Sequence, residues 1–186
     1  MKQNWKPGTL VYPLPAVMIS CGDEESGPNI ITASWVGTLC SNPPICYASI
    51  RPERYSHDII LRTGEFVINL TTEKLALATD WCGVKSGRDV DKFKAMGLIP
   101  GKATVVKAPT IEEAPLSIEC RVREVKPLGS HDMFIADVVN ILADEAYMDK
   151  DGAFDMQRAG LIAYCHGKYY GLGKFLGKFG WTVKKS

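Results

Sequence analysis

Clusters of turn-forming residues divide the chain into short segments with the residue pattern of β-strands. This division restricts the possible folds more than any other feature of the sequence. We predict strands at 11–20, 29–39, 45–51, 65–70, 116–126 and 133–142. Segment 29–39 is expected to be one continuous strand, because apolar residues alternate with hydroxyl-bearing residues along it. The short polar segment 128–132 is expected to be a hairpin turn between the last two strands.

Helices are fewer than strands in this pattern. Pro52, a helical spacing of apolar residues and Gly64 predict a helix over 52–63, and further helices are expected at 73–81 and 91–96. The last of these lies in a basic excursion at 83–101, which we expect at the surface. Strands and helices do not alternate regularly, and neither an internal repeat nor a linker divides the chain. The sequence therefore predicts a single domain over 1–186, mainly β with added helices, as a Greek-key-like barrel.

Composition excludes several classes of protein. Of the 186 residues, 46% are hydrophobic and 23% charged, as in ordinary globular proteins, and the net charge is only +1. Such a balance provides no overall field for nucleic acid or an anionic membrane, which argues against a nucleic-acid module built on the aromatic, lysine-containing tail 168–185. No apolar segment is long enough to span a bilayer, and the proline-rich segment 1–20 does not resemble a signal peptide. We expect a cytoplasmic protein.

The cysteines and histidines lack the spacing of a metal site. No two cysteines form a C-x-x-C pair, and the histidines are not closely spaced with one another or with a cysteine pair. In the reducing cytosol, buried thiols are the simplest interpretation. We therefore expect neither a metal nor a disulfide at the six cysteines, which are Cys21, Cys40, Cys46, Cys82, Cys120 and Cys165.

One candidate anion site lies where a strand meets a helix. Ser49 and Arg51 are two residues apart and point to the same face of their strand, and Ser56 follows near the start of the predicted helix. A guanidinium, a hydroxyl and free N–H groups at a helix start are suited to a phosphate. The alternative is that Arg51 and Arg54 pair with surface carboxylates, as most arginines do.

A second candidate site lies on the strand over 29–39. Thr32, Ser34 and Thr38 form a row of hydroxyls that could bind a polar ligand, and the small Ala33 leaves the backbone accessible to a flat ring. Hydroxyl residues also commonly line the solvent face of an antiparallel sheet, and taken alone this is the better interpretation.

Five stretches in the same order resemble the flavin reductase-like family, whose members have an FMN-binding split barrel. They are 29–35, 49–56, 86–93, 129–131 and the tail segment 167–174, so the resemblance covers nearly the whole chain. The tail is most similar to that of flavoredoxins, the FMN electron carriers within the family. A dinucleotide fingerprint in 171–176 is rejected, because no strand–helix unit surrounds it.

The resemblance implies a homodimer with FMN near the subunit interface, the ring along 32–35 and the phosphate near Ser49, Arg51 and Ser56. It also implies that Lys92 lies near the cofactor and His131 near the face where hydride arrives. Otherwise Lys92 would be a solvated lysine and His131 a polar hairpin residue. No catalytic side chain is obligatory, because the flavin supplies the redox chemistry. The full set of cofactor-binding residues that we predict is Asn29, Thr32, Ala33, Ser34, Trp35, Ser49, Ile50, Arg51, Tyr55, Ser56 and Lys92.

Two functions follow from this resemblance, and the sequence does not separate them. The first is an NAD(P)H-dependent enzyme that passes electrons to flavin, a metal complex or a redox partner. The second is a non-enzymatic FMN carrier that exchanges electrons with a partner protein.

Overall fold

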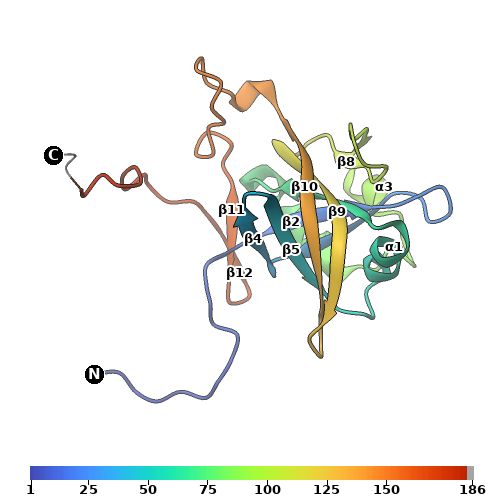
Figure 1. Ribbon diagram of the computed structural model, residues 1–186, viewed down its shortest axis with the longest axis horizontal. Coiled ribbons are helices and arrows are strands. Elements are labelled where there is room, and N and C mark those ends of the chain that lie inside the picture. The colour runs from blue at the N-terminus through green and yellow to red at the C-terminus, as the bar shows by residue number, and fades with distance from the viewer. Residues whose placement is uncertain (184–186) are drawn as a thin grey trace.

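A computed structural model describes residues 1–183 and shows a mainly β fold built on one seven-stranded antiparallel sheet (Figure 1). The strand order is β3-β2-β6-β9-β10-β5-β4, and every neighbouring pair is antiparallel. The prediction of a mainly β fold with added helices is confirmed. The strands are β2 (Val17–Cys21), β3 (Asn29–Ala33), β4 (Val36–Ser41), β5 (Pro44–Ile50), β6 (Glu65–Leu70), β9 (Leu116–Pro127) and β10 (Asp132–Ala143).

The sheet rolls up because its two edge strands follow one another in the chain. Only Ser34 and Trp35 separate β3 at one edge from β4 at the other. Three residue steps span at most about 11 Å, so the edges must lie close together and the sheet must curve into a barrel. The prediction of one continuous strand over 29–39 is therefore wrong, since the alternation of side chains continues through a break in the backbone pairing.

The barrel is filled by alternate residues of its strands. Helix α1 (Tyr55–Thr63) adds Ile59 and Ile60 to this core, and Gly64 ends the helix with a left-handed φ of 69°. The helix starts later than predicted. Arg54 N–H donates to Arg51 O in a turn at 3.0 Å, so Pro52 lies in that turn and not in the helix. The strand residues in the core are Val17, Ile19, Cys21, Ile31, Val36, Cys46, Ala48, Ile50, Phe66, Ile68, Cys120, Phe134 and Ala136.

A second layer covers the outside of β2 and β3. It contains η1 (Glu73–Leu75), α2 (Ala76–Val84), α3 (Lys92–Met96) and the short strands β7 (Pro100–Gly101) and β8 (Thr110–Ile111). Met18 and Ile30 point outward from the barrel into a cluster with Cys82 of α2 and Phe93 of α3. The helix predicted at 73–81 is therefore a 3₁₀ turn followed by an α-helix that extends three residues further.

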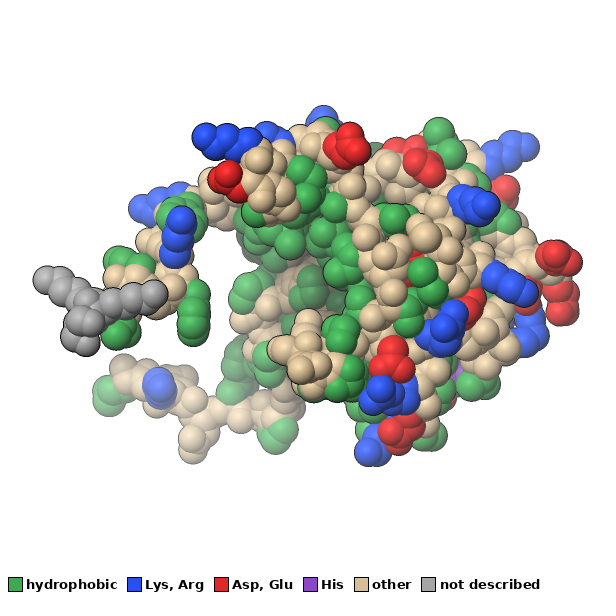
Figure 2. Space-filling model, turned by 45° about the horizontal axis from the view of Figure 1, so that its top comes forward, with side chains coloured by type: hydrophobic (Ala, Val, Ile, Leu, Met, Phe, Trp, Pro, Cys, Tyr) green, Lys and Arg blue, Asp and Glu red, His purple; other side chains and the backbone are tan. Residues whose placement is uncertain are grey.

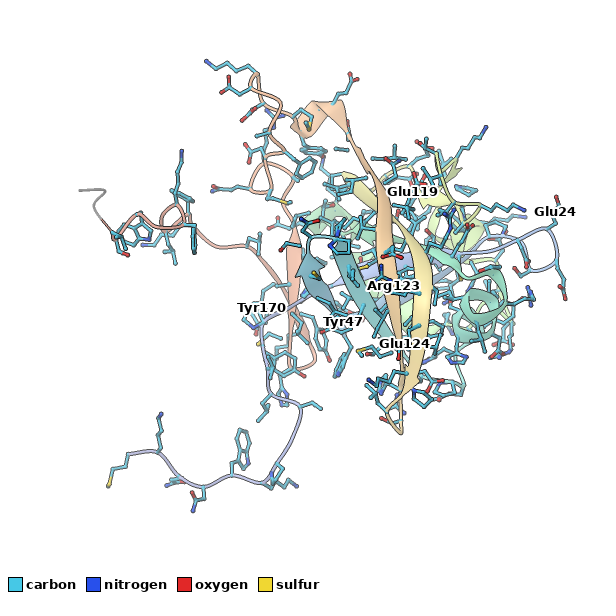
Figure 3. All side chains as sticks on the ribbon, in the orientation of Figure 1. Glu24, Tyr47, Glu119, Arg123, Glu124 and Tyr170 are labelled. Atoms are coloured by element: carbon cyan, nitrogen blue, oxygen red, sulfur yellow. The ribbon has the colours of Figure 1, made fainter. Side chains whose placement is uncertain are left out.

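A buried carboxylate fixes the loop that follows β7. Glu119 lies on β9 (labelled in Figure 3) and is fully buried. Its oxygens accept hydrogen bonds from the N–H groups of Thr104, Val105 and Val106 at 2.6–2.9 Å and from Asn140 Nδ2 at 2.8 Å. Burial raises the pKa of Glu119, but these four donors outweigh it and hold the pKa below its usual value.

The two ends of the chain build a small separate sheet in the order β1-β11-β12. Strand β1 (Leu14–Pro15) pairs with β11 (Ile162–Cys165), which pairs with β12 (Lys168–Gly171). Before β11 the chain forms the short η2 (Glu145–Tyr147). Beyond this sheet, both terminal segments extend from the same side of the molecule (Figure 1). The predicted lysine-containing tail ends at Lys185, so its last residues lie outside the described part of the chain.

All six cysteines are free thiols, and four of them are buried. Cys46 and Cys120 approach to 3.5 Å between their Sγ atoms. They lie on β5 and β9, with β10 between them. Within residues 1–183, no helix is long and apolar enough to cross a membrane.

Candidate functional site

The interruption between β3 and β4 opens one wall of a cavity of about 330 Å³, which we call the aromatic pocket. The barrel supplies the segments around Ala33 and Ile50, α2 supplies a second wall, and the β11–β12 hairpin supplies a third. Four aromatic rings come from parts of the chain that are far apart in sequence. The lining residues are Ile31, Thr32, Ala33, Ser34, Trp35, Ser49, Ile50, Arg51, Arg54, Asp80, Gly83, Val84, His131, Tyr164 and Tyr169.

The rings of this pocket contact one another. His131 stacks on Trp35 with centroids 6.1 Å apart and planes 11° apart, and Tyr164 lies 6.4 Å from Trp35 and 5.8 Å from Tyr169. Burial, and next the neighbouring Asp80 carboxylate, raise the pKa of Tyr169 to about 12, so its hydroxyl keeps its proton. Sequence reasoning missed both tyrosines, because only the tertiary fold brings the β11–β12 hairpin to the barrel.

His131 lies in the wall of the aromatic pocket beside Arg51. Burial and the positive charge of Arg51 lower the pKa of its imidazole below the usual value. Its Nδ1 lies 2.9 Å from Ser130 Oγ, and the chain bends here between β9 and β10 as predicted. The ring is therefore held at the pocket wall, and its surroundings disfavour the protonated form.

The predicted row of hydroxyls is not one continuous surface. Thr32 lines the aromatic pocket, but its hydroxyl donates to the carbonyl of Thr79 in α2. Ser34 is buried in the break between the strands, whereas Thr38 is exposed on β4 and lines neither pocket. A Cβ at Gly83 would lie 3.2 Å from Thr32 Cβ, which shows how closely α2 approaches β3. Hence backbone groups and rings, more than hydroxyls, form the surface of this pocket.

A second cavity of about 260 Å³ adjoins the first, and we call it the basic pocket. The two pockets share Ile31, Arg54 and Gly83 in their walls. Four cationic side chains surround the second cavity, against one carboxylate, so it is suited to an anion. Its lining residues are Ile31, Glu53, Arg54, Tyr55, Ser56, Cys82, Gly83, Lys85, Ser86, Gly87, Arg88 and Lys92.

Lys92 is a buried cation in the basic pocket. Its Nζ donates to Ile30 O of β3 and to Cys82 O of α2, both at 2.7 Å. An ammonium has three donors, so one donor remains after these two bonds. Burial lowers the pKa of Lys92 to about 8, which places its change of charge near neutral pH. The alternative of a solvated lysine is wrong, and the excursion at 83–101 is only partly a surface feature.

Arg88 ties the outer wall of the basic pocket to α1. Its guanidinium donates to Glu53 O at 3.0 Å and to Asp58 Oδ2 at 3.2 Å, and it lies 5.2 Å from the centre of the Tyr55 ring. A Cβ at Gly87 would collide with the Asn29 side chain, so glycine is needed for this close approach. Arg88 belongs to the stretch 86–93 that was singled out in the sequence, although its role as a pocket residue was not predicted.

The structure divides the predicted anion site between the two pockets. Ser49 and Arg51 line the aromatic pocket, whereas Ser56 and Tyr55 line the basic pocket. Arg51 is half-exposed, and its Nη1 lies 3.4 Å from Glu53 Oε1, an ion pair of the kind that the alternative interpretation expected. The helix N-terminus therefore lies beside the basic pocket, and Arg51 is separated from it by the turn over 51–54.

Two predicted site residues, Asn29 and Ile50, are buried and expose little of their side chains to the pockets. Asn29 lines neither cavity; it is buried, and its Nδ2 donates to Ser56 Oγ at 2.7 Å. Ile50 lines the aromatic pocket, although its residue is only 2% exposed and its side chain belongs to the barrel core. Among residues 1–183, no group of three or more histidines, cysteines and carboxylates is arranged to hold a metal ion.

Known proteins share this fold over its whole length. Flavoredoxin of Desulfovibrio vulgaris (Miyazaki F) is 31% identical, with a TM-score of 0.92 over 99% of this chain and 100% of that one. A protein of Shewanella frigidimarina with a split barrel domain is 25% identical, with a TM-score of 0.81 over 89% of this chain and 85% of that one. The fold is thus a split barrel, as predicted.

Sequence comparison leads to the same group. The FMN reductase (NADH) RutF of Agrobacterium fabrum is 28% identical over 138 residues, which cover 72% of this chain and 76% of that protein. The family model of the flavin reductase like domain matches residues 9–173, the greater part of the chain including every residue of both pockets. The chain belongs to the flavin reductase-like family.

Proposed function

We propose that this protein binds one FMN across the two adjoining pockets, with the ring in the aromatic pocket and the phosphate in the basic pocket, and transfers electrons through it. The observation that carries the proposal is the shared wall of the pockets at Ile31, Arg54 and Gly83. A flat apolar group and an anion on one molecule would fill both sites at once. Membership of a flavin reductase-like family supports a flavin as that molecule.

The residues of the aromatic pocket fit a planar ring. The break at Ser34 and Trp35 leaves backbone groups outside regular strand pairing, and these suit the polar edge of a flavin. Trp35 O itself accepts from Ser49 N–H at 2.8 Å, so the strand end is held in place. Tyr164 and Tyr169 line the wall that the β11–β12 hairpin supplies.

The residues of the basic pocket fit a phosphate monoester. Lys92 offers its remaining donor from a buried position, and Ser56, Arg54 and Arg88 surround the same cavity. This differs from our prediction from sequence, which placed the phosphate beside Ser49 and Arg51. In the present proposal Arg51 lies at the ring end and sets the charge near His131.

FMN, when bound, accepts and donates the electrons, and the side chains described above orient it and exclude water. His131 stacks with Trp35 at the edge of the aromatic pocket and is suited to orient a planar electron donor there. We favour NAD(P)H as that donor, with flavin, a metal complex or a redox partner as acceptor. The second candidate is an FMN carrier, and the overall similarity to flavoredoxin favours it.

We further propose that the protein is a cytoplasmic homodimer. Figure 2 shows hydrophobic side chains around a hollow between the body and the terminal segments, and Tyr170 (labelled in Figure 3) lies on that side. Phe175, Phe179 and Trp181 are exposed, and an apolar surface of this kind needs a cover. Light scattering should return twice the chain mass of 20.4 kDa; a mass of one chain at micromolar concentration with FMN present would overturn the dimer.

The visible spectrum tests the electron-transfer proposal. The purified protein should be yellow or become yellow with one equivalent of FMN. Under anaerobic conditions, bleaching by NADH or NADPH supports the reductase, whereas bleaching by dithionite alone supports the carrier. A protein that retains no flavin at micromolar concentration would contradict both.

A further inference from the structure

A series of polar contacts runs from the start of β10 through α1 to Arg88. His57 Nε2 lies 2.9 Å from Asp132 Oδ2, and His57 Nδ1 lies 3.3 Å from Asp58 Oδ1. Asp58 in turn accepts from Arg88 Nη2 through its other oxygen at 3.2 Å. Of these residues only Arg88 lines a pocket, so this series of contacts supports the site from behind.

His57 is fixed at the centre of this series of polar contacts. It is buried, and its ring packs edge-on against Phe134 of β10, with centroids 5.2 Å apart. Both of its nitrogens face carboxylates, so a rotation of the ring would break both contacts. The contact with Asp132 ties α1 to β10, and the contact with Asp58, the next residue of α1, orients the carboxylate that binds Arg88.

The two ends of this series of polar contacts, Asp132 and Arg88, lie at different pockets. Asp132 is the first residue of β10 and directly follows His131, which stacks on Trp35 in the aromatic pocket. Asp58 holds Arg88 in the segment 85–88, which forms the outer wall of the basic pocket and which we call the strap. The strap lies flush against Asn29 and Tyr55, because Gly87 has no Cβ.

We propose that His57 is a positioning residue for both pockets: through Asp132 it keeps His131 against Trp35, and through Asp58 it keeps the strap closed over the basic pocket. The ligands of the two pockets come from the proposed function. The positioning of His131 and of the strap involves only residues of the protein, so it does not depend on which ligand binds.

Three variants separate the contact of His57 with Asp132 from its contact with Asp58. Asp58→Ala should speed amide hydrogen exchange of the strap about two- to fivefold, the range expected for a half-exposed ion pair, and leave His131 unchanged. Asp132→Ala should leave the strap unchanged but release His131, whose NMR-measured pKa should rise toward 6.5 as the ring loses its packing. His57→Ala should produce both effects.

The matched control is Arg62→Ala. It removes an exposed ion pair between α1 and Asp23, which lines neither the aromatic nor the basic pocket, so neither readout should change. Where His57→Ala does not fold, His57→Phe keeps a ring against Phe134, removes both carboxylate contacts and is measured by the same two readouts. Wild-type strap exchange or a wild-type His131 pKa in the His57 variants would overturn the proposal.

A flavin readout distinguishes this proposal from the proposed function. The preference for FMN over riboflavin should fall about two- to fivefold in Asp58→Ala and stay at the wild-type value in Arg62→Ala. If the wild-type protein binds no flavin, the proposed function fails, while hydrogen exchange and the His131 pKa still decide whether His57 positions both pockets.

Discussion

The aromatic pocket and the basic pocket share a wall but recognise a ligand in different ways. The first presents rings and backbone around Trp35 and Tyr164, with cations only at its edge. The second is lined by the cationic side chains of Arg54, Lys85, Arg88 and Lys92. Apolar and stacking contacts serve any flavin, whereas cations serve only a flavin with a phosphate. If one FMN spans both pockets, as we propose, this difference means that separate residues set its affinity and its preference over riboflavin.

The strongest test of this separation is Lys92→Met. Loss of the ammonium should weaken FMN binding about ten- to hundredfold, because a charge-assisted hydrogen bond contributes about 1.5–3 kcal/mol. Riboflavin affinity should change little. Fluorescence titration of the apo protein measures both, and Lys94→Met on the exposed face of the same helix is the control. Equal losses for the two flavins would remove Lys92 from the phosphate site.

The pH dependence of FMN affinity follows from Lys92. Its folded pKa is lowered to about 8, so the cation is present below that pH and is lost above it. FMN affinity should therefore fall as pH rises from 7 to 9.5, by at most about tenfold per unit above 8, while riboflavin affinity stays level. Without flavin, the free energy of unfolding should rise between about pH 8 and 10.5, because in this range Lys92 is protonated in the unfolded chain and has lost its proton in the folded protein.

Tyr164→Ala tests the other pocket. Removal of a ring that contacts Trp35 and Tyr169 should weaken FMN and riboflavin binding alike, by about two- to tenfold, the range of an aromatic pair. Tyr147→Ala, which removes a tyrosine paired with Phe154 and outside both pockets, should leave both affinities at wild-type values. A variant that loses FMN but keeps riboflavin would contradict the assignment of the ring to this pocket.

The smallest effect is expected for Arg51→Ala. Its guanidinium is half-exposed and paired with Glu53, so FMN affinity should change by only about twofold. Arg54→Ala should have a larger effect, because Arg54 lines both pockets. A loss of more than about tenfold in Arg51→Ala would return the phosphate to the strand end where the sequence pattern placed it.

Local sequence patterns were sufficient for much of the fold. Alternating apolar residues and turn formers predicted β5, β6, β9 and β10, and Gly64 predicted the end of α1, whereas the two-residue strands β7 and β8 were not predicted. The break at Ser34 and Trp35 was missed because side-chain alternation continues across it. The break is visible only in the folded sheet, where β3 pairs with β2 at one edge and β4 pairs with β5 at the other.

The candidate site was predictable where its residues lie on those strands. The segments around Ala33 and Ser49 do line a pocket, and Ser56 lines the adjoining one. Tyr164 and Tyr169 carry no local signal, since their place in the site depends on pairing of the two chain ends through β1 and β11. The burial of Lys92 likewise depends on carbonyls from β3 and α2 that no sequence period encodes.

The central claim is that a single ligand spans both pockets, and parallel titration of apo protein with FMN and riboflavin tests it most directly. The account predicts that FMN binds at least about tenfold more tightly in the wild-type protein, and that Lys92→Met removes most of that difference. Equal dissociation constants for FMN and riboflavin in the wild-type protein would contradict it.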